Sequence, residues 1–136
     1  MKLDLEFSSG TALQMQAGAY ALVRDAEDRI LLVRAANGRF YLPGGRIEPS
    51  ETPEEALARE VEEECGWSIR VGEPVGEAFQ PILGGSIMLR ATYWQAALSG
   101  LVHEEPEHQM LWTPRSEAAS RLHRDADIGA ILSLPG

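Results

Sequence analysis

The stretch from Gly45 to Trp67 reads GRIEPSETPEEALAREVEEECGW, and it carries most of the information on the structure and chemistry expected of this chain. Its second half predicts one helix over residues 53–65. Thr52 can cap the first turn, Pro53 suits the first helical position, and Gly66 can end the helix in a left-handed conformation. Apolar spacing predicts a buried side for this helix. The residues on that side are Leu57, Ala58, Val61 and Cys65.

The same stretch concentrates negative charge. Eight glutamates and one arginine fall between Glu48 and Glu64, so eight minus one gives −7 of the net charge of −9. At about 100° per residue, Glu60, Glu63 and Glu64 share a side of the helix away from the apolar one. Such carboxylates repel each other unless a cation lies among them, and hard divalent ions prefer oxygen ligands. The pattern indicates a site for Mg²⁺ or Mn²⁺, and the alternative is a solvated acidic face.

The whole segment resembles the Nudix box, Gly-x5-Glu-x7-Arg-Glu-U-x-Glu-Glu-x-Gly-U, in which U is a bulky apolar residue. Every specified position is matched, although the last apolar place holds a tryptophan where an aliphatic residue is more typical. The preceding Leu-Pro-Gly-Gly and Glu48 also resemble the family's usual approach to the box. The matched positions are Gly45, Glu51, Arg59, Glu60, Val61, Glu63, Glu64, Gly66 and Trp67. The chain is thereby identified as a small, MutT-like member of the Nudix hydrolase family.

The resemblance implies a hydrolase that cleaves a nucleoside diphosphate linked to another group, through attack of water at phosphorus. The three glutamates named above would hold the divalent ions. Glu51 and Arg59 would brace the loop against the helix, with Arg59 orienting the carboxylates. Gly44 and Gly45 would let the backbone approach the pyrophosphate, where a Cβ would obstruct it.

The general base could be a carboxylate of the box or a glutamate of a later loop. In several relatives a glutamate before a late strand ending in tryptophan ligates metal or acts as the base. Here that loop precedes Trp112, and Glu107 is the first choice, with Glu104 or Glu105 next. Gln109 departs from the pattern of relatives that have a glutamate three residues before the tryptophan. The alternative is that the loop is an exposed acidic connection.

Substrate contacts are expected from aromatic and basic side chains. A nucleotide base could stack on an exposed aromatic ring, but aromatic rings are readily buried, and the favoured alternative for each ring taken singly is a place in the core. The aromatic candidates are Phe40, Tyr41, Phe79 and Trp94. An arginine could contact phosphate, and the candidates are Arg34, Arg39, Arg46 and Arg90. Of these we select Phe79, Trp94 and Arg46, together with the two glycines before the helix.

Strand signals surround the helix and helical segments follow them. The predicted strands are residues 3–7, 14–24, 29–34, 40–42, 67–71, 75–79, 87–95 and 110–112, and the later helices are residues 116–122 and 127–134. Residues 14–24 and 29–34 are expected to form a hairpin, and Pro-Gly-Gly after residue 42 to stop a strand. This order predicts an α/β fold with a central mixed β-sheet. The resemblance implies a Nudix-type α/β/α sandwich with a C-terminal helix.

The composition limits the class of protein. A chain of 136 residues, 44% of them hydrophobic, is expected to form one domain over residues 1–136. Twelve Lys and Arg against 21 Asp and Glu argue against binding a long nucleic acid or an anionic membrane. A single cysteine, Cys65, and a beginning without an apolar leader favour a cytoplasmic location. The sequence is compatible with a monomer or a homodimer.

Two other functions are consistent with part of the sequence. A catalytically silent Nudix-fold sensor could bind a nucleotide such as ADP-ribose, but it has no need of three metal-binding carboxylates. A non-enzymatic acidic interaction domain would leave the complete box unexplained. The sequence therefore favours a pyrophosphohydrolase acting on a nucleoside triphosphate, normal or oxidised, or on a nucleotide-sugar or ADP-ribose type of diphosphate.

Overall fold

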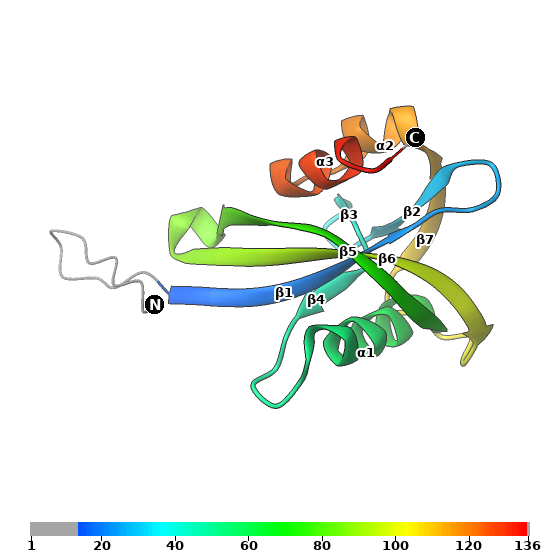
Figure 1. Ribbon diagram of the computed structural model, residues 1–136, viewed down its shortest axis with the longest axis horizontal. Coiled ribbons are helices and arrows are strands. Elements are labelled where there is room, and N and C mark those ends of the chain that lie inside the picture. Colours follow the sequence, from blue (N-terminus) through cyan, green and yellow to red (C-terminus); the bar gives the residue numbers. More distant parts are fainter. Residues whose placement is uncertain (1–13, 136) are drawn as a thin grey trace, which may run out of the picture.

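Helices cover both faces of the strands in the computed structural model, which describes residues 14–135 (Figure 1). The helix α1 (Pro53–Cys65) lies on one side, and α2 (Arg115–Arg121) and α3 (Asp125–Leu132) lie on the other. The strands are β1 (Gln14–Val23), β2 (Arg29–Arg34), β3 (Phe40–Tyr41), β4 (Gly44–Arg46), β5 (Trp67–Ile82), β6 (Ile87–Leu101) and β7 (Gln109–Pro114). A short 3-10 helix, η1 (Leu83–Gly85), joins β5 to β6. The α/β/α sandwich is confirmed, and the strand predicted at residues 3–7 lies outside the described residues.

The strands form two sheets. In the four-stranded sheet the order is β4-β1-β6-β5, with β1 parallel to β6 and the other pairs antiparallel. The second sheet is antiparallel, in the order β3-β2-β7. The predicted hairpin of β1 with β2 is wrong. Its turn forms, with the Asp25 N–H donating to the Arg29 carbonyl at 3.0 Å, but only Arg24 and Ile30 are bridged before the strands diverge.

Of the two strand predictions near glycine and proline, one needs correction and the other is confirmed. The segments predicted at residues 67–71 and 75–79 are one strand, β5, in which irregularities around Pro74 accommodate the missing N–H. The predicted stop of a strand at Pro-Gly-Gly is confirmed, since β3 ends at Tyr41; Gly44 and the next two residues then form a new strand, β4, on the edge of β1. Gly44 has φ +140°, and a Cβ there would lie 2.1 Å from the carbonyl oxygen of Ala19. Only glycine permits this pairing.

Residues at the two ends of α1 form the hydrogen bonds that cap the helix. The Thr52 hydroxyl accepts from the Glu55 N–H at 3.1 Å, and the Thr52 N–H donates to the Glu55 carboxylate at 2.9 Å. Gly66 ends the helix with φ +78°, and its N–H donates to the Glu62 carbonyl at 2.8 Å. Ala58, predicted on the buried side, is only half-buried, and Ala56 replaces it there. The apolar residues that α1 buries are Ala56, Leu57, Val61 and Cys65.

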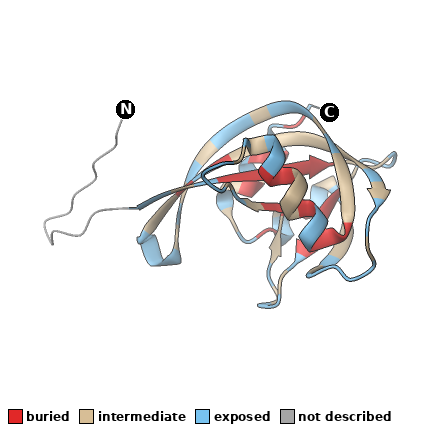
Figure 2. Cartoon of the chain, turned by 90° about the horizontal axis from the view of Figure 1, so that it is seen from below, coloured by how far each residue is buried: buried red, intermediate tan, exposed pale blue. Residues whose placement is uncertain are grey.

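The core consists of two clusters on opposite faces of the sheets, and β1 contributes to both. Ala19 and Ala21 pack on the side of α1, whereas Tyr20 and Leu22 pack on the side of α2 and α3. Figure 2 shows the buried residues gathered along the central strands and the inward sides of the helices. Between residues 14 and 135 the helices are all too short or too polar to cross a membrane.

Candidate active site

Arg59 lies at the centre of an ion-pair network on α1. Its Nε and Nη2 donate to the two oxygens of Glu51 at 2.7 and 2.8 Å, and Nη2 also reaches the Arg46 carbonyl at 3.0 Å. Its Nη1 donates to Glu60 at 2.9 Å and to Glu63 at 3.5 Å. Hydrogen bonds from Arg59 lower the pKa of Glu51 to about 2. Arg59 therefore joins the loop before α1 to two of the three carboxylates predicted to bind metal.

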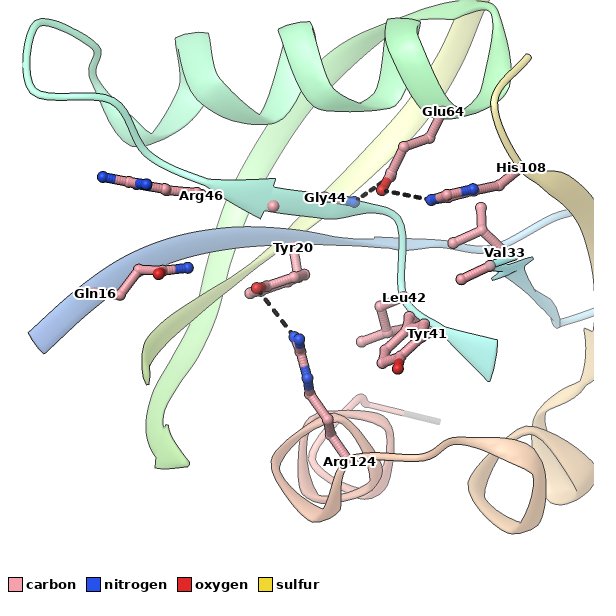
Figure 3. A pocket seen from close by; sticks show the side chains of 12 residues that line it. Gln16, Tyr20, Val33, Tyr41, Leu42, Gly44, Arg46, Glu64, His108 and Arg124 are labelled. Carbon is pink, nitrogen blue, oxygen red and sulfur yellow. Dashed lines mark hydrogen bonds and ion pairs between the residues drawn. The ribbon is translucent and has the colours of Figure 1, made fainter. Parts of the chain in front are cut away.

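Glu64, the third of these carboxylates, is buried on the inner side of α1 (Figure 3). Its Oε1 accepts the Gly44 N–H at 2.8 Å, and its Oε2 lies 3.6 Å from His108 Nε2. Burial raises the pKa of Glu64 from an ordinary 4.5 to about 8, and the Gly44 hydrogen bond opposes this only in part. The side chain is thus held against β4 in a setting that disfavours its charge.

Glu60 lies against the same strand, β4, at the next residue, Gly45. A Cβ on Gly45 would stand 2.6 Å from Glu60 Cδ, so the carboxylate occupies the space that any other residue would fill. Burial also raises the pKa of Glu60, and its contact with Arg59 opposes that effect. The two glycines therefore serve two neighbouring carboxylates. Gly44 donates a hydrogen bond to one, and Gly45 makes room for the other.

The loop of residues 102–108 packs on the C-terminal end of α1. The N–H groups of Glu107 and His108 donate to the Glu63 and Glu64 carbonyls at 3.2 and 3.0 Å. Burial is the main cause of the raised pKa values of Glu60 and Glu64, and the charge of Glu107 adds to both. The other loop residues predicted as alternatives or departures, Glu104, Glu105 and Gln109, are exposed. The fold thus brings Glu107 beside the carboxylates of α1.

The carboxylates fit a hard divalent cation by their chemistry. In residues 14–135, no three metal-ligating side chains stand close enough together to enclose an ion. Arg59 Nη1 lies between the carboxylates of Glu60 and Glu63, and Glu64 is hydrogen-bonded to the backbone. All three nevertheless supply only oxygen atoms, which Mg²⁺ and Mn²⁺ prefer. An ion could use the carboxylate oxygens that Nη1 does not contact, while Arg59 keeps its hydrogen bonds to Glu51, Glu60 and Glu63.

A cavity of about 220 Å³ lies beside Glu64 (Figure 3). The end nearer α1 is lined by Glu64, His108 and the β4 residues Gly44, Gly45 and Arg46, and the end nearer α3 by Tyr20, Tyr41 and Arg124 (Figure 3). The Arg46 side chain extends along β4 away from Glu64 and His108. The structure does not bring the predicted Phe79 and Trp94 to this cavity. Phe79 is 55% exposed on β5. Trp94 packs on the α1 side of the sheet and donates to Thr92 Oγ1 at 3.2 Å.

Tyr20, His108 and Arg124 are among the residues of the cavity that were not predicted from the sequence. Tyr20 had one signal, because a glycine within a strand often marks a close approach, and a Cβ on Gly18 would lie 2.8 Å from the Tyr20 hydroxyl. Arg124 had none, since 104 residues separate it from the tyrosine that it contacts.

Comparison with known proteins decides the family. The family model of the NUDIX domain matches residues 14–132, which include both sheets and the whole of α1. The chain belongs to the Nudix family.

Relatives of this Nudix domain act on several nucleotides. The CTP pyrophosphohydrolase of Escherichia coli is 35% identical over 92 residues, which cover 67% of this chain and 67% of that protein. The human 8-oxo-dGDP phosphatase NUDT18 is 48% identical over 50 residues, or 34% of this chain and 16% of that protein. The solution structure of the E. coli ORF135 protein has a TM-score of 0.74 and 29% identity, covering 89% of each chain. The matches span only 26%, 44% and 38% of three further curated relatives.

Proposed function

We propose that this Nudix domain is a Mg²⁺- or Mn²⁺-dependent pyrophosphohydrolase. Its substrate would be a nucleoside triphosphate, normal or oxidised, or a nucleotide-sugar or ADP-ribose type of diphosphate. The observation that carries the proposal is the position of Glu60 and Glu64, which lie against Gly45 and Gly44 beside the cavity. A pyrophosphate there would meet carboxylates suited to a divalent ion and a backbone edge without side chains.

The residues of α1 would have two roles, namely binding the divalent ion and orienting the carboxylates that bind it. Glu60, Glu63 and Glu64 would hold the divalent ion, which would neutralise phosphate charge and make bound water more acidic. Arg59 would orient the carboxylates from behind, since Glu51 fixes two of its nitrogens. Arg46, at the same end of the cavity, is the basic side chain that we assign to phosphate.

Water must lose a proton as it attacks phosphorus. Glu107 is our candidate for the base, because its loop is hydrogen-bonded to the end of α1 and its charge reaches both Glu60 and Glu64. An exposed carboxylate at that position can pass the proton to solvent. A carboxylate of the box is the alternative base.

The expected ligand is small. The net charge of −9 opposes binding of a long nucleic acid, and the cavity is smaller than the roughly 300 Å³ at which sites for whole drug-sized molecules begin. It suits one ring system of a nucleotide whose phosphates lie nearer to α1. A cytoplasmic location agrees with the free, buried Cys65, and the protein would act as a monomer or a homodimer.

A substrate panel tests the function. The protein is incubated with Mg²⁺ or Mn²⁺ and common or 8-oxo nucleoside triphosphates, CTP, ADP-ribose or nucleotide sugars, and the products are separated by chromatography. Glu64→Gln is the blank, and Glu62→Gln is its matched control because Glu62 is exposed on the same helix. Turnover lost only in the blank supports the proposal. Binding without turnover would instead favour the nucleotide sensor.

A further inference from the structure

We propose that Arg124 selects the base of the nucleotide, and that it takes a base whose edge offers two neighbouring hydrogen-bond acceptors. This inference rests on the proposed function, because it assumes that phosphates lie at the α1 end of the cavity. Arg124 lies at the other end (Figure 3). Guanine, through O6 and N7, and cytosine, through O2 and N3, are the bases with such an edge.

Arg124 is fixed by the two tyrosines of the cavity. It is the residue before α3, and its Nη1 donates to the Tyr20 hydroxyl at 3.1 Å. Its guanidinium lies 5.0 Å from the ring centre of Tyr41 and 5.7 Å from that of Tyr20. Figure 3 shows the side chain rising from α3 toward Tyr20. A guanidinium held over two aromatic rings and hydrogen-bonded to one hydroxyl has few orientations, so its remaining N–H groups have a defined direction.

A buried acid in the first turn of α3 acts electrostatically on this arginine. Asp127 is fully buried in the first turn of α3, where Oδ1 accepts the Tyr93 hydroxyl at 2.9 Å. Burial by itself lowers the pKa of Arg124. The interactions with Tyr20, Asp127 and Tyr41 raise the pKa by more, so the net shift is upward. The guanidinium therefore stays charged. A half-buried and charged donor in a cavity needs an acceptor when water is displaced from it.

The donor pattern of Arg124 determines which bases fit. A guanidinium has five N–H donors and no acceptor, and only one contact goes to Tyr20. Two parallel N–H groups match O6 and N7 of guanine or O2 and N3 of cytosine. Adenine presents an amino group beside N7, and thymine presents N3–H between its carbonyls, so each would face Arg124 with a donor. Oxidation of guanine at C8 turns N7 into a donor and removes the match as well.

The inference is tested by the binding of nucleoside monophosphates, which needs no turnover. The affinities of dGMP, dCMP, dAMP, dTMP and 8-oxo-dGMP are measured by calorimetry. We expect dGMP or dCMP to bind on the order of tenfold or more tightly than dAMP and dTMP, as a bidentate base contact usually provides. Whichever of dGMP and dCMP binds more tightly identifies the base that Arg124 selects. If it is dGMP, 8-oxo-dGMP should bind about as weakly as dAMP.

Two substitutions separate the base contact from the fold. Arg124→Lys keeps the charge near Tyr20 and Asp127 but lacks the fork, so it should lose the preference and keep its melting temperature. Arg124→Gln should move the preference toward dAMP, because a glutamine amide pairs with adenine. Arg121→Gln is the matched control, since exposed Arg121 lies over Phe40, 5.8 Å from its ring centre, and does not line the cavity.

The outcomes distinguish the inference from the proposed function. Equal binding of all bases by the native protein, or a preference that persists in Arg124→Lys, overturns the inference. An equal loss for every base in Arg124→Lys also overturns it, because Arg124 would then contact phosphate. Triphosphate turnover is measured in parallel. Turnover without an Arg124-dependent preference leaves the proposed function standing, whereas that preference without turnover leaves only the inference standing.

Discussion

The guanidinium of Arg59 holds the carboxylate of Glu51 by two hydrogen bonds, Nε to Oε2 at 2.7 Å and Nη2 to Oε1 at 2.8 Å. Paired bonds of this kind fix the plane of the arginine as well as its position. The third nitrogen, Nη1, is thereby directed at Glu60. Glu51, which does not line the cavity, thus fixes the position of the Glu60 carboxylate through Arg59.

Replacing Glu51 by glutamine should weaken catalysis without unfolding the protein. The variant loses the charge that fixes Arg59, so Arg59 can move and Glu60 loses its orientation. Loss of such a supporting contact typically costs about 10–100-fold in metal affinity or activity. The measurement is kcat as a function of Mg²⁺ concentration. Glu54→Gln, an exposed position in the first turn of α1, should match the native protein. Equal activity of both variants would show that the brace has no role in turnover.

Replacing Glu64 by glutamine should make the metal-free protein more stable at high pH while abolishing turnover. The folded protein binds the Glu64 proton more tightly than the unfolded chain, since the pKa is about 8 against an ordinary 4.5. Its contribution to stability is therefore fully present below about pH 4.5 and is lost as the pH rises through about 8. Each pKa unit is worth about 1.4 kcal/mol, so the loss is on the order of a few kcal/mol.

Thermal unfolding in EDTA measures this effect. The melting temperature of the native protein should fall relative to Glu64→Gln between about pH 5.5 and about pH 8.5, and Mg²⁺ should restore it only in the native protein. The difference between the two proteins isolates Glu64 from other titrating groups. A constant difference across this range would mean that Glu64 is charged in the folded state throughout.

Replacing Gly45 by alanine should displace the Glu60 carboxylate. The new Cβ would lie 2.6 Å from Glu60 Cδ, and the side chain can swing away at little cost to folding. Because a displacement of about 1 Å in an active site can cost on the order of 100-fold, we expect a large loss of kcat with a small change in melting temperature. Gly129→Ala is the control, since nothing lies within 4 Å of its Cβ. Wild-type turnover in Gly45→Ala would contradict the role of Glu60.

Replacing Glu107 by glutamine tests the general base. If Glu107 accepts the proton of water, kcat should fall by about 100-fold or more, as for general bases elsewhere, while the affinity for Mg²⁺ changes little. Equal losses of rate and metal affinity would make Glu107 a metal ligand instead. An unchanged rate returns the role to the box, unless Glu104→Gln or Glu105→Gln shows the loss.

Local signals made α1 predictable. The capping residue Thr52, the proline after it and the terminal Gly66 each act on neighbours within a few residues, and the structure shows each of them in the predicted role. The box could also be recognised because its carboxylates lie within one helix. By contrast, the hairpin of β1 and β2 was predicted from a turn that does form. The pairing of the two strands beyond that turn depends on β6 and β7, which are distant in the sequence.

The contact of Arg124 with Tyr20 at the far end of the cavity had no local signal in the sequence. Arg124 and Tyr20 meet because α3 packs on the face of β1 opposite to α1, and no spacing in the sequence encodes that contact. Phe79 and Trp94 were selected for their exposed or stacking character alone. Both residues lie in strands, as predicted, but their side chains are directed away from the cavity. Successive side chains of a strand alternate between the two faces of a sheet. The face on which each ring lies depends on how the strands pair with strands that are distant in the sequence.

The alternation of β1 has a consequence for how proteins of this architecture can vary. Ala19 and Ala21 lie under α1, whereas Tyr20 lies between them on the face of the cavity. One residue inserted before Tyr20 would reverse every later side chain of the strand, placing the tyrosine under the helix and an alanine in the cavity. The strand therefore cannot lengthen by single residues to admit a larger ligand. Changes in substrate range are expected instead in the loops of residues 35–39 and 102–108, where insertions leave the sheet intact.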